Sequence, residues 1–237
     1  CARLHGMPLA IELAAARVKL LSPDAILARL EHQLNILAAG ARDSPARQQT
    51  LRGAIAWSYD ILDEPLRRLL DRLSVFAGGF DLDAAEAIGG PSGEIGMDVL
   101  DGLLALADQS LIRSLGTDPP RFRMLETIRE FAAEMLDGRD DAAEIRGRHT
   151  RWYLDLAETA APGLAGSEQR SLLEQLEREH DNIRAVLDRA AAAGDAPSAI
   201  RLAFAMWRFW QKRGHLNEAR RRLEAISAET WSREDPV

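Results

Sequence analysis

The sequence predicts a mainly α protein with three successive parts: a helical segment, a winged-helix domain with a small β-hairpin, and an irregular, tetratricopeptide-like α-solenoid. Apolar residues recur at intervals of three and four along most of the 237 residues, which indicates amphipathic helices. Strand-like alternation is confined to SLIRSL and RFRML, two short segments in the middle of the chain. Glycine-flanked corners separate the helical stretches of the last third.

The first part, residues 1–43, is predicted to be the helical end of a larger unit. Gly6 and Pro8 shape a turn, because glycine accepts a positive φ and proline suits the first position of a helix. A second helix is expected after Ser22-Pro23-Asp24, where a capping serine precedes proline and an early acid. The polar run at residues 41–49, ARDSPARQQ, is interpreted as a linker.

The second part, residues 44–137, has the order of elements of a winged helix. Helical stripes are followed by two short strand-like segments, and GTDPP between those segments predicts a hairpin with a long loop. Three helices followed by a two-stranded wing are therefore expected. The third of these helices, MDVLDGLLALADQ, takes the position of the recognition helix, and a further helix begins near Leu125.

The third part, residues 138–237, is predicted to be a stack of helices. Gly194 and Gly214 stand 20 residues apart, which leaves one helix of roughly 18 residues between them. This spacing is shorter than the ~34-residue period of a regular tetratricopeptide array. Ala199 and Ala219 follow the two corners, and their small side chains allow neighbouring helices to approach closely. An irregular α-solenoid is therefore expected.

Composition excludes several classes of function. The net charge of −7 gives no global attraction to nucleic acid or to an anionic membrane. No apolar run approaches ~18 residues and no signal peptide is evident, so cytoplasmic residence is expected. Lys19 and Lys212 are the only lysines, and neither follows the glycines of a phosphate-binding loop. A complete nucleotide hydrolase is therefore not expected within this chain.

Catalytic and metal-binding motifs are not evident. Neither a G-x-S-x-G elbow nor an H-E-x-x-H zinc motif occurs, so this chain is not expected to be an enzyme. Cys1 and His5 lack a third group to orient them, and the single cysteine excludes a multi-cysteine metal site. Glu177 and His180 share the i, i+3 spacing of metal-binding helices, but no second copy exists, so a solvated face is predicted and no metal is expected.

Direct DNA binding by the winged helix is not expected. The helix in the recognition position carries Asp98, Asp101 and Asp108 and no basic residue, and carboxylates repel a phosphate backbone. Arginines of the hairpin form either a contact set for an anion or an intramolecular pairing face; they are Arg113, Arg121 and Arg123.

The aromatic residues of the last third allow two interpretations. Trp207 and Trp210 either pack between helices of the solenoid or form an exposed partner-binding patch, and we keep both as candidate partner-binding residues. Arg220, Arg221 and Arg222 are interpreted as a solvated face or as a contact for an acidic partner.

Four segments in order give the chain a resemblance to a known family. HGMPLAIELAAARVKLLSP, LRGAIAWSYDILDEPLRRLLDRLSVFAGGFDLDAAEAI, DVLDGLLALADQSLI and RFRMLETIREFA resemble the C-terminal part of an NB-ARC or STAND-type regulatory ATPase. The chain is most similar in pattern to the bacterial transcriptional regulators that couple such an ATPase to a DNA-binding output domain. The resemblance implies that residues 1–43 are the end of the helical (ARC) domain of the ATPase, and that the nucleotide-binding domain lies upstream and outside this chain.

The resemblance also implies nucleotide-binding residues. In the family a Gly-x-Pro turn closes over the nucleotide with its proline on the adenine, which here corresponds to Gly6, Met7 and Pro8. A Met-His-Asp triplet faces the ADP phosphates in the family, and the matching residues here are Met124, Leu125 and Glu126. Leucine cannot donate a hydrogen bond to a phosphate, so Arg123 is an alternative phosphate contact. ATP or ADP is expected only together with the missing upstream domain.

The function implied is that of the lever and sensor of a nucleotide-switched regulator of transcription. The implied partners are the upstream nucleotide-binding domain and a protein or small-molecule inducer at the repeats. DNA would be bound only by an output domain outside this chain, and no membrane is involved. The alternative is a helical-repeat scaffold that binds proteins and has no response to nucleotide.

Overall fold

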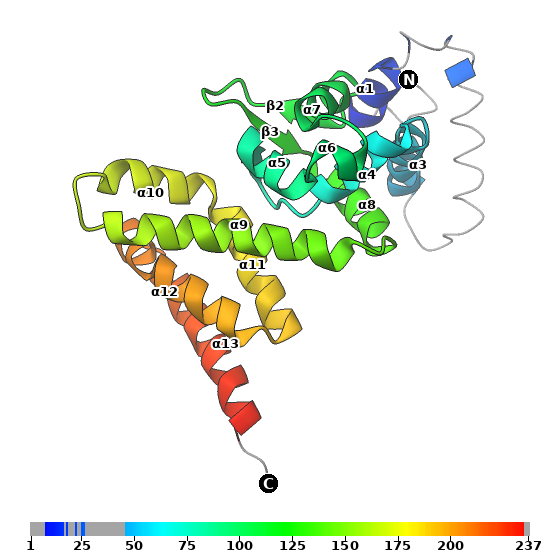
Figure 1. Ribbon diagram of the computed structural model, residues 1–237. Coiled ribbons are helices and arrows are strands. Elements are labelled where there is room, and N and C mark those ends of the chain that lie inside the picture. Colours follow the sequence, from blue (N-terminus) through cyan, green and yellow to red (C-terminus); the bar gives the residue numbers. More distant parts are fainter. Residues whose placement is uncertain (1–7, 17, 19–21, 23–24, 27–45, 235–237) are drawn as a thin grey trace. The chain divides into compact units, whose positions relative to one another are not determined.

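The computed structural model describes residues 8–16, 18, 22, 25–26 and 46–234, and they form a mainly helical structure with one small sheet (Figure 1). Contacts divide the chain into two compact units. The first comprises the described residues of Cys1–Val75 and Asp81–Ala142, and the second those of Phe76–Phe80 and Ala143–Val237. This division falls at 142/143, close to the predicted start of the repeats at residue 138.

The N-terminal helices agree only in part with the predicted pattern. Helix α1 (Pro8–Ala16) begins at Pro8 as predicted. The predicted helix after Ser22 lies mostly outside the described residues. Helix α3 (Ala46–Asp60) begins inside the segment interpreted as a linker, so the linker prediction is wrong for residues 46–49. Arginine and glutamine are good helix formers, which explains why this polar run is helical.

The helices of the first unit begin where aspartates cap them. Helices α4 (Glu64–Leu73), α5 (Leu82–Gly89) and α7 (Val99–Asp108) follow Asp63, Asp81 and Asp98, each of which accepts a hydrogen bond from a backbone N–H of the first turn. The short helix α6 (Ser92–Ile95) and helix α8 (Glu126–Asp137) complete the set. The core is formed by apolar residues of several helices, among them Leu69, Leu70, Leu73, Leu103, Leu106 and Ile128.

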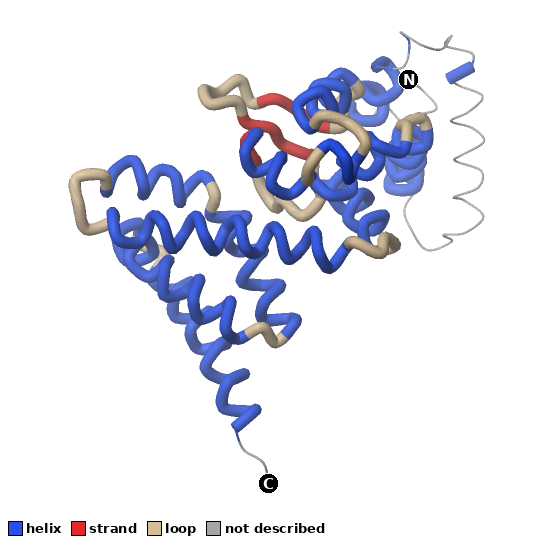
Figure 2. Tube along the Cα trace, in the orientation of Figure 1, coloured by secondary structure: helices blue, strands red, loops and turns tan. Residues whose placement is uncertain are grey.

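The predicted two-stranded hairpin is confirmed, and a third strand joins it to form a three-stranded sheet. Its strands are β1 (Gly79–Asp81), β2 (Ile112–Ser114) and β3 (Arg121–Met124), in the order β1-β3-β2. Strands β2 and β3 are antiparallel and joined by the long loop predicted from GTDPP, drawn in tan in Figure 2. Sequence analysis missed β1 because a strand of three residues, the first of them Gly79, is too short to show alternation.

The second unit consists of helices. They are α9 (Ala142–Gly163), α10 (Gln169–Arg178), α11 (His180–Ala193), α12 (Ala196–Arg213) and α13 (Leu216–Glu234). Gly194 and Gly214 end α11 and α12 in the left-handed conformation, at φ of 64° and 82°, so both predicted corners are confirmed. Helix α12 packs against α11 and α13. The tetratricopeptide-like character of this stack stays a prediction.

Helices α10 and α11 are separated by a single residue, Glu179. The buried Glu179 carboxylate accepts hydrogen bonds from the Tyr153 hydroxyl and the Asn182 amide, both at 3.0 Å. These bonds anchor the residue between α10 and α11. Within the described part of the chain, no helix has the length and apolar composition needed to cross a membrane.

A buried carboxylate links three segments of the first unit. Asp71 on α4 has no exposed surface and accepts hydrogen bonds from the Tyr59 hydroxyl at 2.9 Å and from Nε of Arg139 at 2.6 Å. Arg139 also lies 3.0 Å from Glu64. Burial raises the pKa of Asp71 to about 6 despite its bonds with Arg139 and Tyr59, and burial raises the pKa of Tyr59 to about 12.

We predict that Asp71→Asn changes the dependence of stability on pH. Because the folded-state pKa of Asp71 lies above its ordinary value of 3.8, the wild type loses stability as the pH rises from about 4 to about 6. Asparagine does not titrate, so the free energy of unfolding of the variant relative to wild type rises by up to roughly 3 kcal/mol over this window. Urea unfolding at pH values across the window measures this difference. A difference that is constant with pH contradicts the prediction.

We predict opposite effects for two glycine-to-alanine substitutions in helices. A Cβ at Gly102 on α7 would clash with the Leu69 side chain and lie 3.3 Å from Sδ of Met97, so Gly102→Ala destabilises by about 1–2 kcal/mol. At Gly147 on α9 nothing lies within 4 Å of the added Cβ, so Gly147→Ala stabilises by up to about 1 kcal/mol. Urea unfolding ranks the two variants, and stabilisation by Gly102→Ala would contradict the close packing.

Candidate functional site

Helix α7 presents an apolar outer face in the position of a recognition helix. Its inner face buries Leu103 and Leu106 in the core of the unit. Its outer face exposes Leu100 and Leu104, which keep 41% and 56% of their surface accessible. Sequence analysis did not single out this pair. The i, i+4 spacing of two leucines away from the buried stripe was the available signal.

Carboxylates surround the two exposed leucines. Asp98, Asp101 and Asp108 are all exposed, and α7 carries no lysine or arginine. One Asp98 oxygen caps the helix by accepting from the N–H groups of Leu100 and Asp101, at 2.9 and 3.2 Å. A phosphate backbone approaching this face would meet negative charge, and α7 itself offers no cationic side chain to bind it. The face suits an apolar protein surface with basic residues at its edge better than it suits DNA.

The register of the wing divides the three hairpin arginines. Arg113 and Arg123 stand directly opposite each other on β2 and β3, and both are exposed. Arg113 donates a hydrogen bond to the Glu12 carboxylate of α1 at 2.5 Å. Arg121 is buried, and its guanidinium lies 4.0 Å from Asp81. Like charges in a cross-strand pair repel, so an anion bound beside Arg113 and Arg123 would relieve the repulsion.

The structure describes some of the predicted nucleotide-binding residues, and these lie in different elements. Gly6 and Met7 lie outside the described residues, and Pro8 is the first residue of α1. Met124 ends β3 with its side chain buried, opposite Ile112. The structure therefore gives Met124 a packing role, and its contact with nucleotide stays a prediction.

The junction between β3 and α8 brings Arg123 and Glu126 together at the surface. Arg123 is exposed and forms no ion pair with any residue that the structure describes. Leu125 is the N-cap residue of α8, and its side chain accepts no hydrogen bond, whereas its carbonyl oxygen accepts from the N–H groups of Ile128 and Arg129, at 3.0 and 2.9 Å. Glu126 accepts a hydrogen bond from Arg129 at 3.0 Å, and this bond lowers the pKa of the Glu126 carboxyl.

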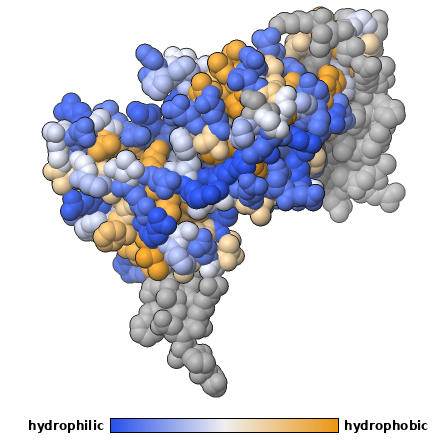
Figure 3. Space-filling model, in the orientation of Figure 1, coloured by the Kyte–Doolittle hydropathy of each residue, from blue (hydrophilic) through white to orange (hydrophobic). Residues whose placement is uncertain are grey.

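The two predicted partner-binding tryptophans have different environments. Trp207 is 46% exposed and forms a row on α12 with Ile200 and with Phe204, which is 82% exposed. This row lines a groove of ≈ 640 Å³ that Ala161 and Pro162 of α9 also line. Elsewhere on the visible surface of the described residues, hydrophobic side chains form small groups among hydrophilic ones (Figure 3).

Trp210 has no exposed surface and is a core residue. Its indole N–H donates to Nε2 of His180 at 3.3 Å. The interpretation of Trp210 as part of an exposed patch is therefore corrected. Partner binding stays a prediction for Trp207.

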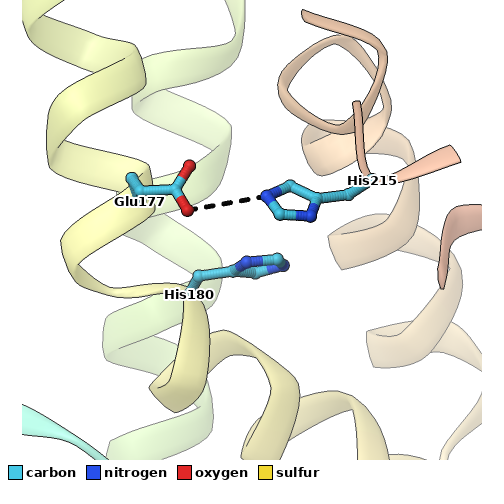
Figure 4. A group of neighbouring side chains, drawn as sticks. All are labelled: Glu177, His180 and His215. Atoms are coloured by element: carbon cyan, nitrogen blue, oxygen red, sulfur yellow. Dashed lines mark ion pairs between the residues drawn. The ribbon is translucent and has the colours of Figure 1, made fainter. Parts of the chain in front are cut away.

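The predicted solvated face at Glu177 and His180 is wrong for His180. His180 is the first residue of α11 and is buried, and burial lowers its pKa to about 4. Because the chain breaks at Glu179, the His180 ring packs beside Phe209 of α12 and His215 in the following corner, with ring centroids 5.0 and 4.7 Å away. Glu177, His180 and His215 thus form one cluster (Figure 4). Sequence spacing could not reveal it, because His215 lies on a different helical hairpin.

Comparison with known families identifies the fold of the first unit. Residues 62–137 match the family described as "Winged helix-turn-helix domain", and this range contains α4 to α8 with β2 and β3. The segment is a winged helix-turn-helix domain. The second helix of a helix-turn-helix motif lies in the major groove of DNA. Helix α7 takes that position here, so its acidic and apolar outer face is unusual for this domain.

Relatives extend the similarity over most of the chain. The chain is 40% identical over 219 residues to a Mycobacterium tuberculosis H37Rv protein described as "Putative HTH-type transcriptional regulator Rv0890c", covering 92% of this chain and 25% of that protein. A Mycobacterium bovis relative with the same description matches equally. An uncharacterized M. tuberculosis H37Rv protein is 39% identical over 153 residues, which cover 64% of this chain and 39% of that protein. No solved structure matches the chain significantly.

The chain therefore spans about a quarter of the length of the first relatives. Both of these relatives are described as putative HTH-type transcriptional regulators, and the part of this chain that matches a family model is a winged helix-turn-helix domain.

We predict that the two tryptophans of α12 respond oppositely to substitution. Trp210→Phe removes the hydrogen bond to His180 and leaves unfilled volume, so it lowers the free energy of unfolding by about 1–3 kcal/mol. Trp207→Phe on the exposed row changes it by less than about 0.5 kcal/mol. Urea unfolding of both variants measures the difference, and equal effects would contradict the assignment of Trp210 to the core.

Proposed function

We propose that this chain is the regulatory and sensor portion of a nucleotide-switched transcriptional regulator, and that its winged helix binds a protein surface instead of DNA. This proposal rests on the outer face of α7. Leu100 and Leu104 are exposed there among three carboxylates, without a basic residue on the helix. Interfaces combine an apolar centre with a polar rim, which this face has. In the proposal the partner is the upstream nucleotide-binding domain.

The nucleotide part of the proposal rests on the junction between β3 and α8. An anion at this junction would find the Arg123 guanidinium and the N-terminus of α8, which carries partial positive charge. Arg123 therefore takes the role of phosphate contact that Leu125 cannot fill. The resemblance to regulatory ATPases assigns the base to Gly6, Met7 and Pro8. The phosphate-binding loop and any hydrolysis belong to the upstream domain, with ADP or ATP as the ligand.

The second unit is the sensor in this proposal. Its row of Ile200, Phe204 and Trp207 offers an apolar surface to a protein or small-molecule inducer. Differential contacts of nucleotide and inducer with two arrangements of the domains would provide the switch. The regulator is proposed to reside in the cytoplasm and to contact DNA through an output domain outside this chain.

A second candidate function is direct DNA binding through the wing. The family match favours it, and the exposed cross-strand pair of Arg113 and Arg123 supplies positive charge. A third, a scaffold without nucleotide response, is favoured only by the apolar row on α12. The two experiments below separate these candidates from the switch.

We predict that the chain has no measurable affinity for duplex DNA at physiological salt. The carboxylates of α7 repel phosphates, and the described part of the wing exposes two arginines, Arg113 and Arg123, of which Arg113 is already paired with Glu12. Fluorescence anisotropy with a random-sequence duplex at low and physiological salt measures binding. Binding that weakens with rising salt and is lost in Arg113→Gln/Arg123→Gln would replace our proposal by DNA binding through the wing.

We predict that Arg123→Gln weakens ADP binding about tenfold in the longer protein that includes the upstream domain, because a charge-assisted bond to phosphate is lost. Arg113→Gln is the matched control and leaves the affinity unchanged, since Arg113 is already paired with Glu12. Pro8→Ala also weakens binding by removing the stacked ring. Calorimetric titration measures all three. The absence of ADP binding in the wild type would favour the scaffold, and equal binding by every variant would remove these residues from the nucleotide site.

A further inference from the structure

Three potential metal ligands converge in the second unit. Glu177 lies near the end of α10, His180 begins α11, and His215 lies in the corner between α12 and α13. One donor atom from each residue lies within 4.8 Å of the other two. Figure 4 shows the carboxylate and the two rings turned toward a common point, with Glu177 and His215 joined by the dashed line.

The spacing of the donors fits a small divalent ion. Nε2 of His215 lies 3.5 Å from Oε1 of Glu177. Zinc binds nitrogen and carboxylate oxygen at about 2.0–2.2 Å in a tetrahedron, which places two ligand atoms of one ion roughly 3.3–3.6 Å apart. These two atoms therefore already have the separation of a shared ion. The other separations in the cluster reach at most 4.8 Å, so a shared ion requires the donor atom of His180 to move closer.

One buried ring nitrogen of the cluster makes no well-formed hydrogen bond among the described residues. This atom is Nε2 of His215, and its contact with Oε1 of Glu177, at 3.5 Å, is a long ion pair. Buried nitrogen atoms are nearly always satisfied, so an orphaned one calls for an explanation. A metal ion at this point would satisfy the nitrogen and neutralise part of the charge on Glu177.

We propose that Glu177, His180 and His215 bind a divalent transition metal ion of the zinc class. A set of two histidines and one carboxylate has the borderline character that zinc prefers over magnesium or calcium. Three protein ligands leave a fourth position for water or an external donor. The ion connects the α10–α11 junction with the α12–α13 corner, so its binding stiffens the second unit and offers an input for a sensor.

Charged residues around the cluster can orient the ligands of the ion. Oε2 of Glu218 lies 3.6 Å from Nε2 of His180, and Arg184 and Arg222 hold that carboxylate in place. A ligating imidazole usually donates its other ring N–H to a carboxylate, the role that Glu218 takes when Nδ1 of His180 binds the ion. The second oxygen of Glu177 lies 3.5 Å from Nε of Arg213 and can keep that contact.

Metal binding competes with one existing hydrogen bond. The Trp210 indole donates to Nε2 of His180, so the neutral His180 ring carries its proton on Nδ1. Coordination of the ion through Nδ1 or Nε2 of His180 removes this hydrogen bond and changes the environment of the buried Trp210 indole. Trp210 is thus a built-in reporter, and its fluorescence changes when the ion binds.

The test is titration of the untagged chain with Zn²⁺ by calorimetry and with Co²⁺ by visible absorption. The wild type is expected to bind one ion, to give the intense visible bands of four-coordinate Co²⁺, and to change its tryptophan fluorescence in parallel. His215→Gln and Glu177→Gln are expected to weaken binding roughly tenfold or more. Glu174→Gln is the matched control, since it removes the same charge from an exposed position on the same helix and leaves binding unchanged.

Three outcomes overturn the proposal: no binding of one equivalent by the wild type, undiminished binding by His215→Gln, or equal weakening by Glu174→Gln and Glu177→Gln. Undiminished binding by His215→Gln would assign the ion to other donors of the chain. Circular dichroism of each variant verifies that the helices are retained. The proposal does not rest on the nucleotide switch, because neither the probe ions nor these variants involve nucleotide.

Discussion

The close approach of α7 to α4 decides which surface the winged-helix domain presents. Gly102 has no side chain, and the Leu69 side chain occupies the space that a Cβ would need. Helix α7 can therefore lie deep against α4, with Leu103 and Leu106 buried. Once this rotation of the helix is set, the 3.6-residue period turns Leu100, Asp101 and Leu104 outward. The apolar and acidic surface at the recognition position therefore follows from the packing of Gly102 against Leu69.

Burial and register distribute the charges of the first unit. Asp71 and Arg121 are polar residues in buried positions, and each meets an opposite charge or a hydrogen-bond donor there. The arginines left at the surface of the wing are Arg113 and Arg123, which the antiparallel register places side by side. The tertiary structure thus gives one residue type different environments: Arg121 lies buried near Asp81, Arg113 pairs with Glu12, and Arg123 stays exposed.

The second unit shows how a chain break creates a cluster. Glu179 is held by Tyr153 and Asn182, which interrupts the helix directly before His180. A continuous helix would have kept Glu177 and His180 on one face, as their spacing suggests. The break instead sends His180 into the interior beside Trp210, while Glu177 stays near the surface and His215 arrives from the next corner. Three ordinary residues become one candidate metal centre only in three dimensions.

The sequence by itself determined the helical class, the winged-helix order of elements and the glycine corners. These features depend on local periodicity and on the backbone preferences of single residues, which act over a few positions. It also indicated that α7 is too acidic for DNA, because charge is a property of composition. The tertiary structure alone decided that β1 joins the sheet, and that Trp210 is buried while Trp207 is exposed. It alone brought His215 to His180. Such outcomes depend on contacts between residues far apart in the chain, and no local pattern carries that information.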